Sequence, residues 1–276
     1  MVDRISKASG SLPRRSFRSV LGSLAKVWRV FPIDDEEAIQ NLGTPGTEPL
    51  PSSFRLAVWN LYKGHGGSAF RRDLSTLLQR SDLLLAQEAL LDPRLEQVLL
   101  QTRSSATHAA AYMRSDRLRD GVMSVCGAAI ADEPKRWLSD RREPLFRTPK
   151  AALLTEYPLA GGSTPLRVLN LHASLFRTPR QARHEIRVWV ERAAQPEGPL
   201  IVAGDFNTFS RAHFLRVSRE LSRWGLRHVP IEPAPRSRRN ALDQVFLRGL
   251  RSNGARAVTE VRSSDHFPLE CEIRVR

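Results

Sequence analysis

An acid and an amide stand at the end of a short apolar segment in the stretch Pro199–Ser210. The run Leu200–Ala203, set between turn residues, is typical of a buried strand, and Gly204 lets the backbone turn or be approached closely. Asp205 and Asn207 lie two residues apart, so in extended backbone they project to the same side. Because burying unpaired polar groups is costly, this pair either takes part in chemistry or Asp205 closes a turn with its own backbone.

A second carboxylate, Glu88, ends the apolar run Leu83–Glu88. A lone carboxylate avoids burial, so Glu88 either turns out to solvent or holds a cation. Mg²⁺ suits such a place, because it takes one or two carboxylates and completes its shell with water and substrate phosphate. Asn60 ends the strand-like stretch Phe54–Asn60, where an Asn can form a turn. No cluster of Cys and His occurs, which argues against structural zinc.

Further polar residues stand at the ends of other expected strands. His172 ends Arg167–His172, Asp243 lies in Leu242–Phe246, and Asp265-His266 opens Asp265–Leu269. Together these pieces resemble the endonuclease/exonuclease/phosphatase superfamily, the fold of deoxyribonuclease I, exonuclease III and the neutral sphingomyelinases. The matching segments, in the family's order, are Val58-Trp59-Asn60, Ala86-Gln87-Glu88, Asn170-Leu171-His172, Gly204-Asp205-Phe206-Asn207, Leu242-Asp243-Gln244-Val245-Phe246 and Ser264-Asp265-His266-Phe267-Pro268-Leu269.

Two further runs narrow the resemblance. Trp59-Asn60-Leu61-Tyr62-Lys63 and Arg248-Gly249-Leu250 are similar to segments of the uncharacterised YafD-like bacterial branch. The resemblance implies an α+β fold, a four-layer α/β/β/α sandwich like that of deoxyribonuclease I. Polar clusters at strand ends would then meet at one edge of the sandwich.

The resemblance also implies a metal site. It places Glu88 on the metal with Asn60 and Asp265 close by. We predict Mg²⁺ as the cofactor, with Mn²⁺ as a substitute.

Hydrolysis of a phosphate ester needs an aimed water, stabilised phosphoryl oxygens and a protonated or metal-bound leaving oxygen. We predict that Asp205 orients and deprotonates the water, and that Asn207 holds Asp205 or a phosphate oxygen. His266, as imidazolium, would contact the phosphoryl oxygens, while Asp243 fixes its tautomer and raises its basicity. His172 would be the second histidine, contacting phosphate or the leaving group.

The substrate class is narrowed by the third motif and by charge. Apurinic endonucleases of this superfamily usually carry Tyr-x-Pro-Asn where this chain has Asn170-Leu171-His172-Ala173, as in the deoxyribonuclease, sphingomyelinase and phosphatase branches. The formal charge is +14, and residues 51–276 hold +13 of it. Such a basic field favours anionic partners, although only 5 of the 43 basic residues are Lys, which could equally reflect a preference for Arg codons. We predict a phosphodiesterase, with nucleic acid slightly favoured over phospholipid or inositol phosphate as substrate.

The compartment follows from cysteine usage and hydropathy. Cys126 and Cys271 lie in apolar stretches and indicate reduced core residues. No stretch of about 18 apolar residues occurs, and the apolar segment Val20–Phe31 is interrupted by Lys26 and Arg29. We therefore predict a cytoplasmic protein without a secretory signal.

The chain is expected to divide at residue 50. Residues 1–50 would form a partly disordered appendage that ends in a Gly/Pro/Ser linker, and 51–276 the catalytic domain. Within the appendage, Ser19–Phe31 has apolar residues at helical spacing. That helix would pack on its own domain or make weak contact with an anionic membrane surface.

The expected elements after residue 50 alternate between strands and helices. Pro93 and the capping box at Thr178-Pro179-Arg180-Gln181 mark two helix starts. Further strands are expected near Leu226–Val229, Ala257–Val261 and Leu269–Arg274. From a different functional class, a catalytically idle scaffold that binds a polyanion or a protein stands as the alternative.

Overall fold

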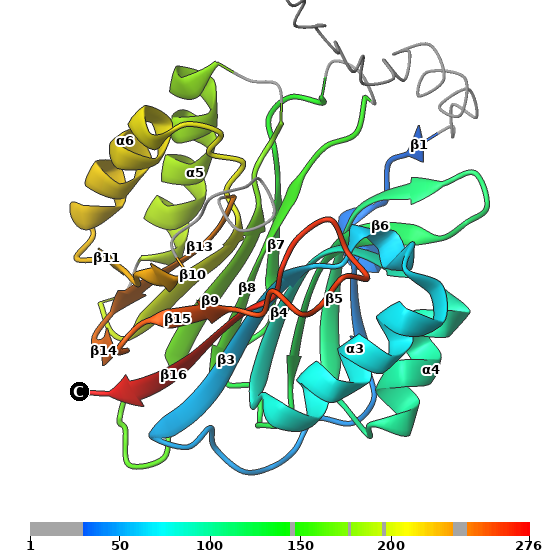
Figure 1. Ribbon diagram of the computed structural model, residues 1–276, viewed down its shortest axis with the longest axis horizontal. Coiled ribbons are helices and arrows are strands. Elements are labelled where there is room, and N and C mark those ends of the chain that lie inside the picture. Colours follow the sequence, from blue (N-terminus) through cyan, green and yellow to red (C-terminus); the bar gives the residue numbers. More distant parts are fainter. Residues whose placement is uncertain (1–29, 144–146, 176–177, 195–196, 234–241) are drawn as a thin grey trace, which may run out of the picture.

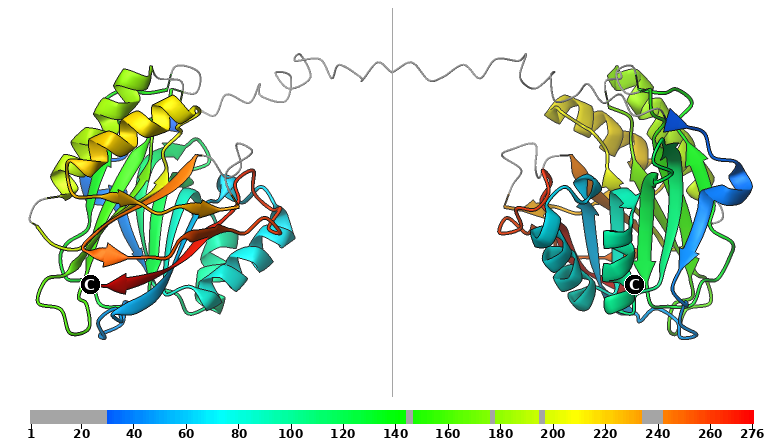
Figure 2. Two further views of the ribbon diagram at one scale, coloured as in Figure 1. Left: turned by 60° about the vertical axis from the view of Figure 1, so that its left-hand side comes forward. Right: turned by 90° about the vertical axis from the view of Figure 1, so that its right-hand side faces the viewer.

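The structure is a computed structural model that describes residues 30–143, 147–175, 178–194, 197–233 and 242–276. Two mixed β-sheets face each other, and helices cover the outer side of each sheet (Figures 1 and 2). The predicted four-layer α/β/β/α sandwich is therefore confirmed.

Within the described residues, the larger sheet has ten strands: β1 (Val30–Phe31), β2 (Ile39–Leu42), β3 (Ser53–Asn60), β4 (Leu83–Leu91), β5 (Ala106–Arg114), β6 (Arg119–Cys126), β12 (Ile231–Glu232), β14 (Leu250–Arg251), β15 (Ala255–Ala257) and β16 (Leu269–Val275). Their order is β1-β5-β6-β4-β3-β16-β15-β12, with β2 beside β5 and β14 beside β16. The smaller sheet has six strands: β7 (Lys135–Leu138), β8 (Ala151–Tyr157), β9 (Leu166–His172), β10 (Leu200–Asp205), β11 (Arg227–His228) and β13 (Asp243–Arg248). Their order is β11-β13-β10-β9-β8-β7.

The helices lie outside the sheets and are α2 (Asp35–Ala38), α3 (Gly67–Arg80), α4 (Pro93–Gln101), α5 (Pro179–Ala193) and α6 (Arg211–Ser222), with a 3₁₀ turn at Tyr62–Gly64. Apolar residues of α3 and α4 pack on the larger sheet, and those of α5 and α6 pack on the smaller one (Figure 1). The predicted capping box at the start of α5 is present, with both the Thr178 and Gln181 side chains bonded to backbone.

The central strands are apolar on both faces because both faces are covered. In β10, Ile201 and Ala203 face the core between the sheets, whereas Leu200 and Val202 face α5 and α6. Alternate residues of a strand point to opposite faces, so an unbroken apolar run is what this position requires.

The parallel pairs bring the predicted polar residues to one edge. Strand β3 runs parallel to β4, and β9 runs parallel to β10 with His172 opposite Asp205. Strand β13 is antiparallel to β10 and begins with Asp243 opposite Asp205. Strand β16 is antiparallel to β3, so the turn that carries His266 lies beside the end of β3. Four strand ends and one turn therefore meet at this edge.

Three expected strands have different bounds. Strand β4 continues beyond Glu88 to Leu91, and Glu88, at φ 45°, lies where the pairing register with β6 shifts. Asp265 and His266 precede β16 instead of opening it. The chain leaves the sheet after Ala257, and Val258 then packs against the α3 and α4 side of the larger sheet.

Two strands in the described part of residues 1–50 belong to the larger sheet. Val30 and Phe31 form β1, which pairs with β5, and Ile39–Leu42 pairs with β5 as well. Leu50, expected in a linker, is buried and bridges to Leu159. The expected helix Ser19–Phe31 is thus wrong at its last two residues, and the rest of it lies outside the described residues. Among the described residues, no helix is both long enough and apolar enough to cross a membrane.

A buried amide cross-links the two sheets beneath the polar edge. Asn170 of β9 is fully buried and accepts a hydrogen bond from Gln87 Nε2 of β4 at 2.7 Å. Its own Nδ2 donates to the carbonyl oxygens of Ala86 at 3.1 Å and Met123 at 2.9 Å. Because each partner belongs to the opposite sheet, these bonds set how β9 sits against β4 and β6.

We expect Asn170→Ala to lower the free energy of unfolding by about 2–4 kcal/mol, because it leaves buried partners unpaired and opens a cavity. Chemical denaturation measures this loss. Ser124→Ala on β6 is the matched control, since Ser124 is equally buried and its hydroxyl has no partner among the described residues. Equal losses in the two variants would show that the Asn170 bonds do not stabilise the fold.

Candidate active site

Asp205 lies at the centre of the polar edge, almost fully buried at the end of β10. Its Oδ2 accepts a hydrogen bond from Asn60 Nδ2 at 3.1 Å, and its Oδ1 accepts one from the Asn207 backbone N–H at 3.0 Å. Asn207, at φ 49°, also donates from Nδ2 to the carbonyl oxygen of Ala173 at 2.8 Å. The turn that the sequence left open as an alternative for Asp205 therefore exists, and it orients the carboxylate toward the other motif residues.

Two imidazoles face the same carboxylate oxygen. Nε2 of His172 lies 3.5 Å and Nε2 of His266 lies 3.9 Å from Asp205 Oδ2. Both distances exceed the usual range of an N–H···O bond, about 2.7–3.2 Å. Each ring nitrogen therefore retains a hydrogen-bonding direction for a further atom held next to Asp205.

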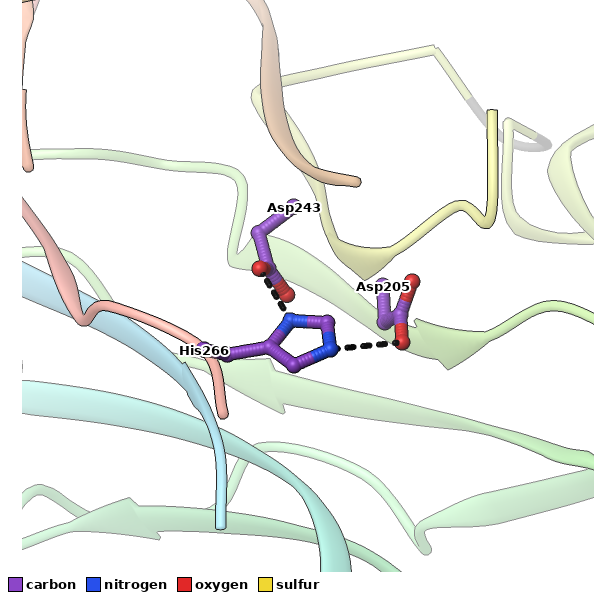
Figure 3. A group of neighbouring side chains, drawn as sticks. All are labelled: Asp205, Asp243 and His266. Carbon is purple, nitrogen blue, oxygen red and sulfur yellow. Dashed lines mark hydrogen bonds and ion pairs between the residues drawn. The ribbon is translucent and has the colours of Figure 1, made fainter. Parts of the chain in front are cut away.

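His266 is held by a second carboxylate. Its Nδ1 lies 2.6 Å from Asp243 Oδ2, and Figure 3 shows the ring between Asp243 and Asp205. The backbone of the same turn is fixed by Trp59 Nε1, which donates to the His266 carbonyl oxygen at 3.1 Å. It is also fixed by the Ser264 hydroxyl, which donates to the Asn60 carbonyl oxygen at 2.7 Å.

The three ionisable groups have shifted pKa values. Burial raises the pKa of Asp205 to about 6, although the charge of His266 opposes the shift. Burial lowers the pKa of His266, but the Asp243 carboxylate outweighs it and raises that pKa to about 10. Burial and the nearby Lys150 charge lower the pKa of His172 well below its usual value. At neutral pH His266 is therefore an imidazolium, whereas His172 is a neutral imidazole.

Glu88 forms a second cluster at the same edge. Its Oε2 is paired with the Lys63 ammonium, which also lies 3.4 Å from Asp120 Oδ2. The same Asp120 oxygen accepts a hydrogen bond from the Tyr112 hydroxyl at 2.7 Å. Burial alone would raise the pKa of Glu88, but the charges of Lys63 and Lys150 outweigh it and hold the pKa below its usual range. The two clusters are adjacent, since Glu88 and His172 line one small cavity.

Lys63 and Asp120 are two charged residues of the site for which no role is predicted from the sequence. Lys63 belongs to the run Trp59–Lys63, which resembles the YafD-like branch, and this resemblance is the only feature of the sequence that draws attention to Lys63. Asp120 lies in β6 and has no motif around it. The basic run Arg236–Asn240, which closely precedes the fifth motif and could either bind phosphates or form a solvated charged segment, lies outside the described residues.

The donor set at this edge fits a hard divalent cation. Glu88, Asn60 and Asp265 offer only oxygen atoms, which Mg²⁺ prefers, and Asp265 is exposed to solvent. The Glu88 cluster already holds a positive charge, that of Lys63. Asp205, Asp243 and His266 also offer three ligand atoms within 4.8 Å of one another. That second trio suits a cation less well, because His266 is itself positively charged.

Comparison with known proteins identifies the class. The family model described as "Endonuclease/Exonuclease/phosphatase family" matches residues 57–266. The chain therefore belongs to the endonuclease/exonuclease/phosphatase family, whose members are metal-dependent phosphoester hydrolases.

One curated relative and two solved structures show how far the similarity extends. A UPF0294 protein of Yersinia enterocolitica is 32% identical over 269 residues, which are 95% of this chain and 100% of the relative. An endonuclease/exonuclease/phosphatase from Beutenbergia cavernae superposes with a TM-score of 0.64 at 14% identity, over 81% of this chain and 72% of the other. ANGEL2, a 2′,3′-cyclic phosphatase solved with adenosine-2′,3′-vanadate, superposes with a TM-score of 0.59 at 14% identity, over 86% of this chain and 98% of the other. The UPF0294 proteins are the YafD-like branch, so the predicted resemblance to that branch is confirmed.

Proposed function

We propose that this protein is a divalent-metal-dependent phosphodiesterase that acts on nucleic acid. The observation that carries the proposal is the arrangement around Asp205 Oδ2. A buried carboxylate is approached by one neutral and one charged imidazole, each just beyond hydrogen-bond distance. Such a site accommodates a water to be activated and the phosphoryl oxygens that it attacks.

In this proposal Asp205 removes the proton from the attacking water. Asn60 and the Asn207 backbone hold its carboxylate, so the oxygen that takes the proton is fixed before the substrate binds. A carboxylate with a raised pKa is a better general base near neutral pH than an ordinary one, because proton transfer to it is less unfavourable.

His266 stabilises the negative charge that develops on the phosphoryl oxygens. Its imidazolium donates through Nδ1 to Asp243, which leaves Nε2–H directed toward the substrate side. His172 is neutral, so its imidazole offers a hydrogen bond to the phosphate or to the leaving oxygen. Glu88, with Asn60 and Asp265, would hold the metal. A bound Mg²⁺ would neutralise charge on the phosphoryl and leaving oxygens.

Two surface features favour nucleic acid as the substrate. A surface hollow between α5 and α6 is lined by four arginines, His184 and one acid, Glu220; the arginines are Arg180, Arg183, Arg187 and Arg223. The excess of positive charge in this hollow would attract a polyanion. Tyr62 and Phe209, each two residues beyond a motif Asn, are exposed aromatic side chains on which bases could stack.

A substrate panel tests the proposal. Plasmid DNA, single-stranded RNA, a 2′,3′-cyclic nucleotide, sphingomyelin vesicles and inositol phosphates would be offered with Mg²⁺, with Mn²⁺ and with EDTA. We expect cleavage of a nucleic acid that EDTA abolishes and that weakens steeply with salt. Cleavage of sphingomyelin or inositol phosphate alone would contradict the assignment to nucleic acid. No cleavage of any compound by folded protein would favour a scaffold that binds polyanions.

The pH dependence of kcat/KM is expected to be bell-shaped. Asp205 must be deprotonated to accept a proton, so activity rises as pH passes about 6. His266 must stay protonated, so activity falls as pH passes about 10. Replacing Asp243 by Asn removes the charge that raises the His266 pKa, and should move the alkaline limb to lower pH. An alkaline limb that is unchanged in Asp243→Asn would show that His266 is not the group responsible.

A further inference from the structure

Lys63 occupies a position that the proposed function leaves unexplained. Its ammonium is bonded to Glu88, the carboxylate expected to bind the metal, and also approaches Asp120. The Lys63 side chain is 24% exposed, while those of Glu88 and Asp120 are 19% and 6% exposed. A cation that binds Glu88 must therefore compete with an internal positive charge for the same partly buried carboxylate.

Asp120 is placed to receive that charge. The Nζ of Lys63 lies 3.4 Å from Asp120 Oδ2, and a charged N–H···O bond is about 2.8 Å long. A shift of about 0.6 Å would thus complete the bond to Asp120 while weakening the bond to Glu88. Tyr112 already donates to the same Asp120 oxygen, which holds the carboxylate in place as a receiver.

The backbone around Lys63 is strained in a way that serves this placement. Tyr62 and Lys63 both have positive φ angles, 49° and 53°. Residues other than Gly rarely adopt this left-handed conformation, because it is sterically unfavourable for them. The turn is held by the Tyr62 N–H, which donates to Asn60 Oδ1 at 3.1 Å, and by the Leu61 N–H, which donates to the Gln87 carbonyl oxygen at 2.8 Å. The position of Lys63 is therefore coupled to Asn60, itself an expected metal ligand.

We propose that Lys63 and a divalent cation are alternative partners of the Glu88 carboxylate, and that Asp120 receives the Lys63 ammonium when the cation binds. Without the ion, Lys63 stabilises two partly buried carboxylates that would otherwise repel each other. With the ion, the same ammonium stays at the catalytic edge on Asp120 and adds positive charge there for a phosphate substrate. Lys63 is then a positioning residue, and the inference rests on the proposed function because it takes Glu88 as a metal ligand.

The test is direct binding of Mn²⁺, followed by the loss of the free-ion electron paramagnetic resonance signal without any substrate. We expect Lys63→Met to bind Mn²⁺ about tenfold more tightly than the wild type, because the ion no longer displaces a charged hydrogen bond. Lys150→Met is the matched control. It removes a similar charge that acts on Glu88 through space, and should change the affinity less.

A double-mutant cycle tests the role of Asp120. Asp120→Asn should weaken Mn²⁺ binding in the wild-type background, because the displaced ammonium loses its receiver. It should have little further effect in Lys63→Met, because no ammonium remains to be received. Equal effects in both backgrounds would overturn the proposal, since Asp120 would then act by its charge alone.

Stability provides a second measurement on the same variants. Mn²⁺ should raise the melting temperature of Lys63→Met more than that of the wild type, because the ion then supplies the only positive charge bound to Glu88. The double variant Lys63→Met/Asp120→Asn keeps the wild-type net charge. It replaces Lys63→Met in these measurements if the single variant does not fold. The inference would be overturned if Lys63→Met bound Mn²⁺ no more tightly than the wild type does, or if no variant bound Mn²⁺ at all. If the wild type and the variants bound Mn²⁺ with the expected order of affinities but the wild type cleaved no phosphoester, only the proposed function would be contradicted.

Discussion

Asp205→Asn should lower kcat by about 10²- to 10⁴-fold, the usual contribution of a general base. An amide keeps the size of the side chain and accepts the hydrogen bond from the Asn207 backbone, but it cannot take a proton from water. The loss should appear in kcat more than in KM, because the base acts on the water during reaction and not on bound substrate. Steady-state kinetics on the substrate found in the panel measures both constants.

The melting temperature of Asp205→Asn shows whether a loss of kcat comes from the missing base or from unfolding. The folded state raises the pKa of Asp205 above its usual value, so above pH 6 the ionised carboxylate is less favourable in the folded protein than in the unfolded chain. Removing that charge should offset the loss of the hydrogen bond from Asn60 Nδ2, which the new amide nitrogen cannot accept, so the melting temperature should change little. Asp82→Asn is the matched control for the loss of one carboxylate away from the site. Asp82 directly precedes β4, at the end of that strand opposite to the polar edge, and pairs with Arg55. Full activity in Asp205→Asn would exclude Asp205 as the base.

The second large effect is expected at His266. His266→Ala removes the imidazolium that faces the phosphoryl oxygens, and should lower kcat by about 10²- to 10³-fold, the effect of losing one such donor. It also leaves Asp243 buried without its partner. Breaking a buried ion pair in this way costs about 3–5 kcal/mol, so the melting temperature should fall as well.

The double variant His266→Ala/Asp243→Asn distinguishes the two effects. It removes the unpaired carboxylate, so it should recover part of the lost melting temperature, measured by thermal unfolding. It should not recover kcat, because the imidazolium is still missing. Recovery of activity together with stability would mean that His266 only stabilises the fold and does not contact the phosphate.

The elements that carry the motifs could be predicted from the sequence because their patterns are local. The apolar run before Asp205 predicted a buried strand, and the capping box at Thr178 predicted a helix start. The family resemblance carried by the order of the motifs implied a sandwich with polar residues at one edge, and the structure brings these residues together. Asp205 is hydrogen-bonded to Asn60 and Asn207 and faces His172 and His266, and Asp243 is hydrogen-bonded to His266. The roles assigned to these residues, and to Glu88 and Asp265 as metal ligands, stay predictions until the variants are measured.

The division of the chain at residue 50 could not be judged from sequence. Strands β1 and β2 are two and four residues long, too short for a visible alternation, and they form because β5 offers them an edge. Whether residues 51–276 fold by themselves stays a prediction, but Val30–Leu42 is part of the larger sheet.

By itself, the sequence determined the order of the motifs and the chemical character of the edge, since these depend on residue types and short spacings, and the motifs implied the fold class through their resemblance to a known family. Only the tertiary structure decided which charges share a site. Lys63, Glu88 and Asp120 are far apart along the chain and meet through two positive φ angles and a register shift in β4. Their pairing is set by how the turn after β3 packs beside β4 and β6, a relation between segments that no single stretch of sequence contains.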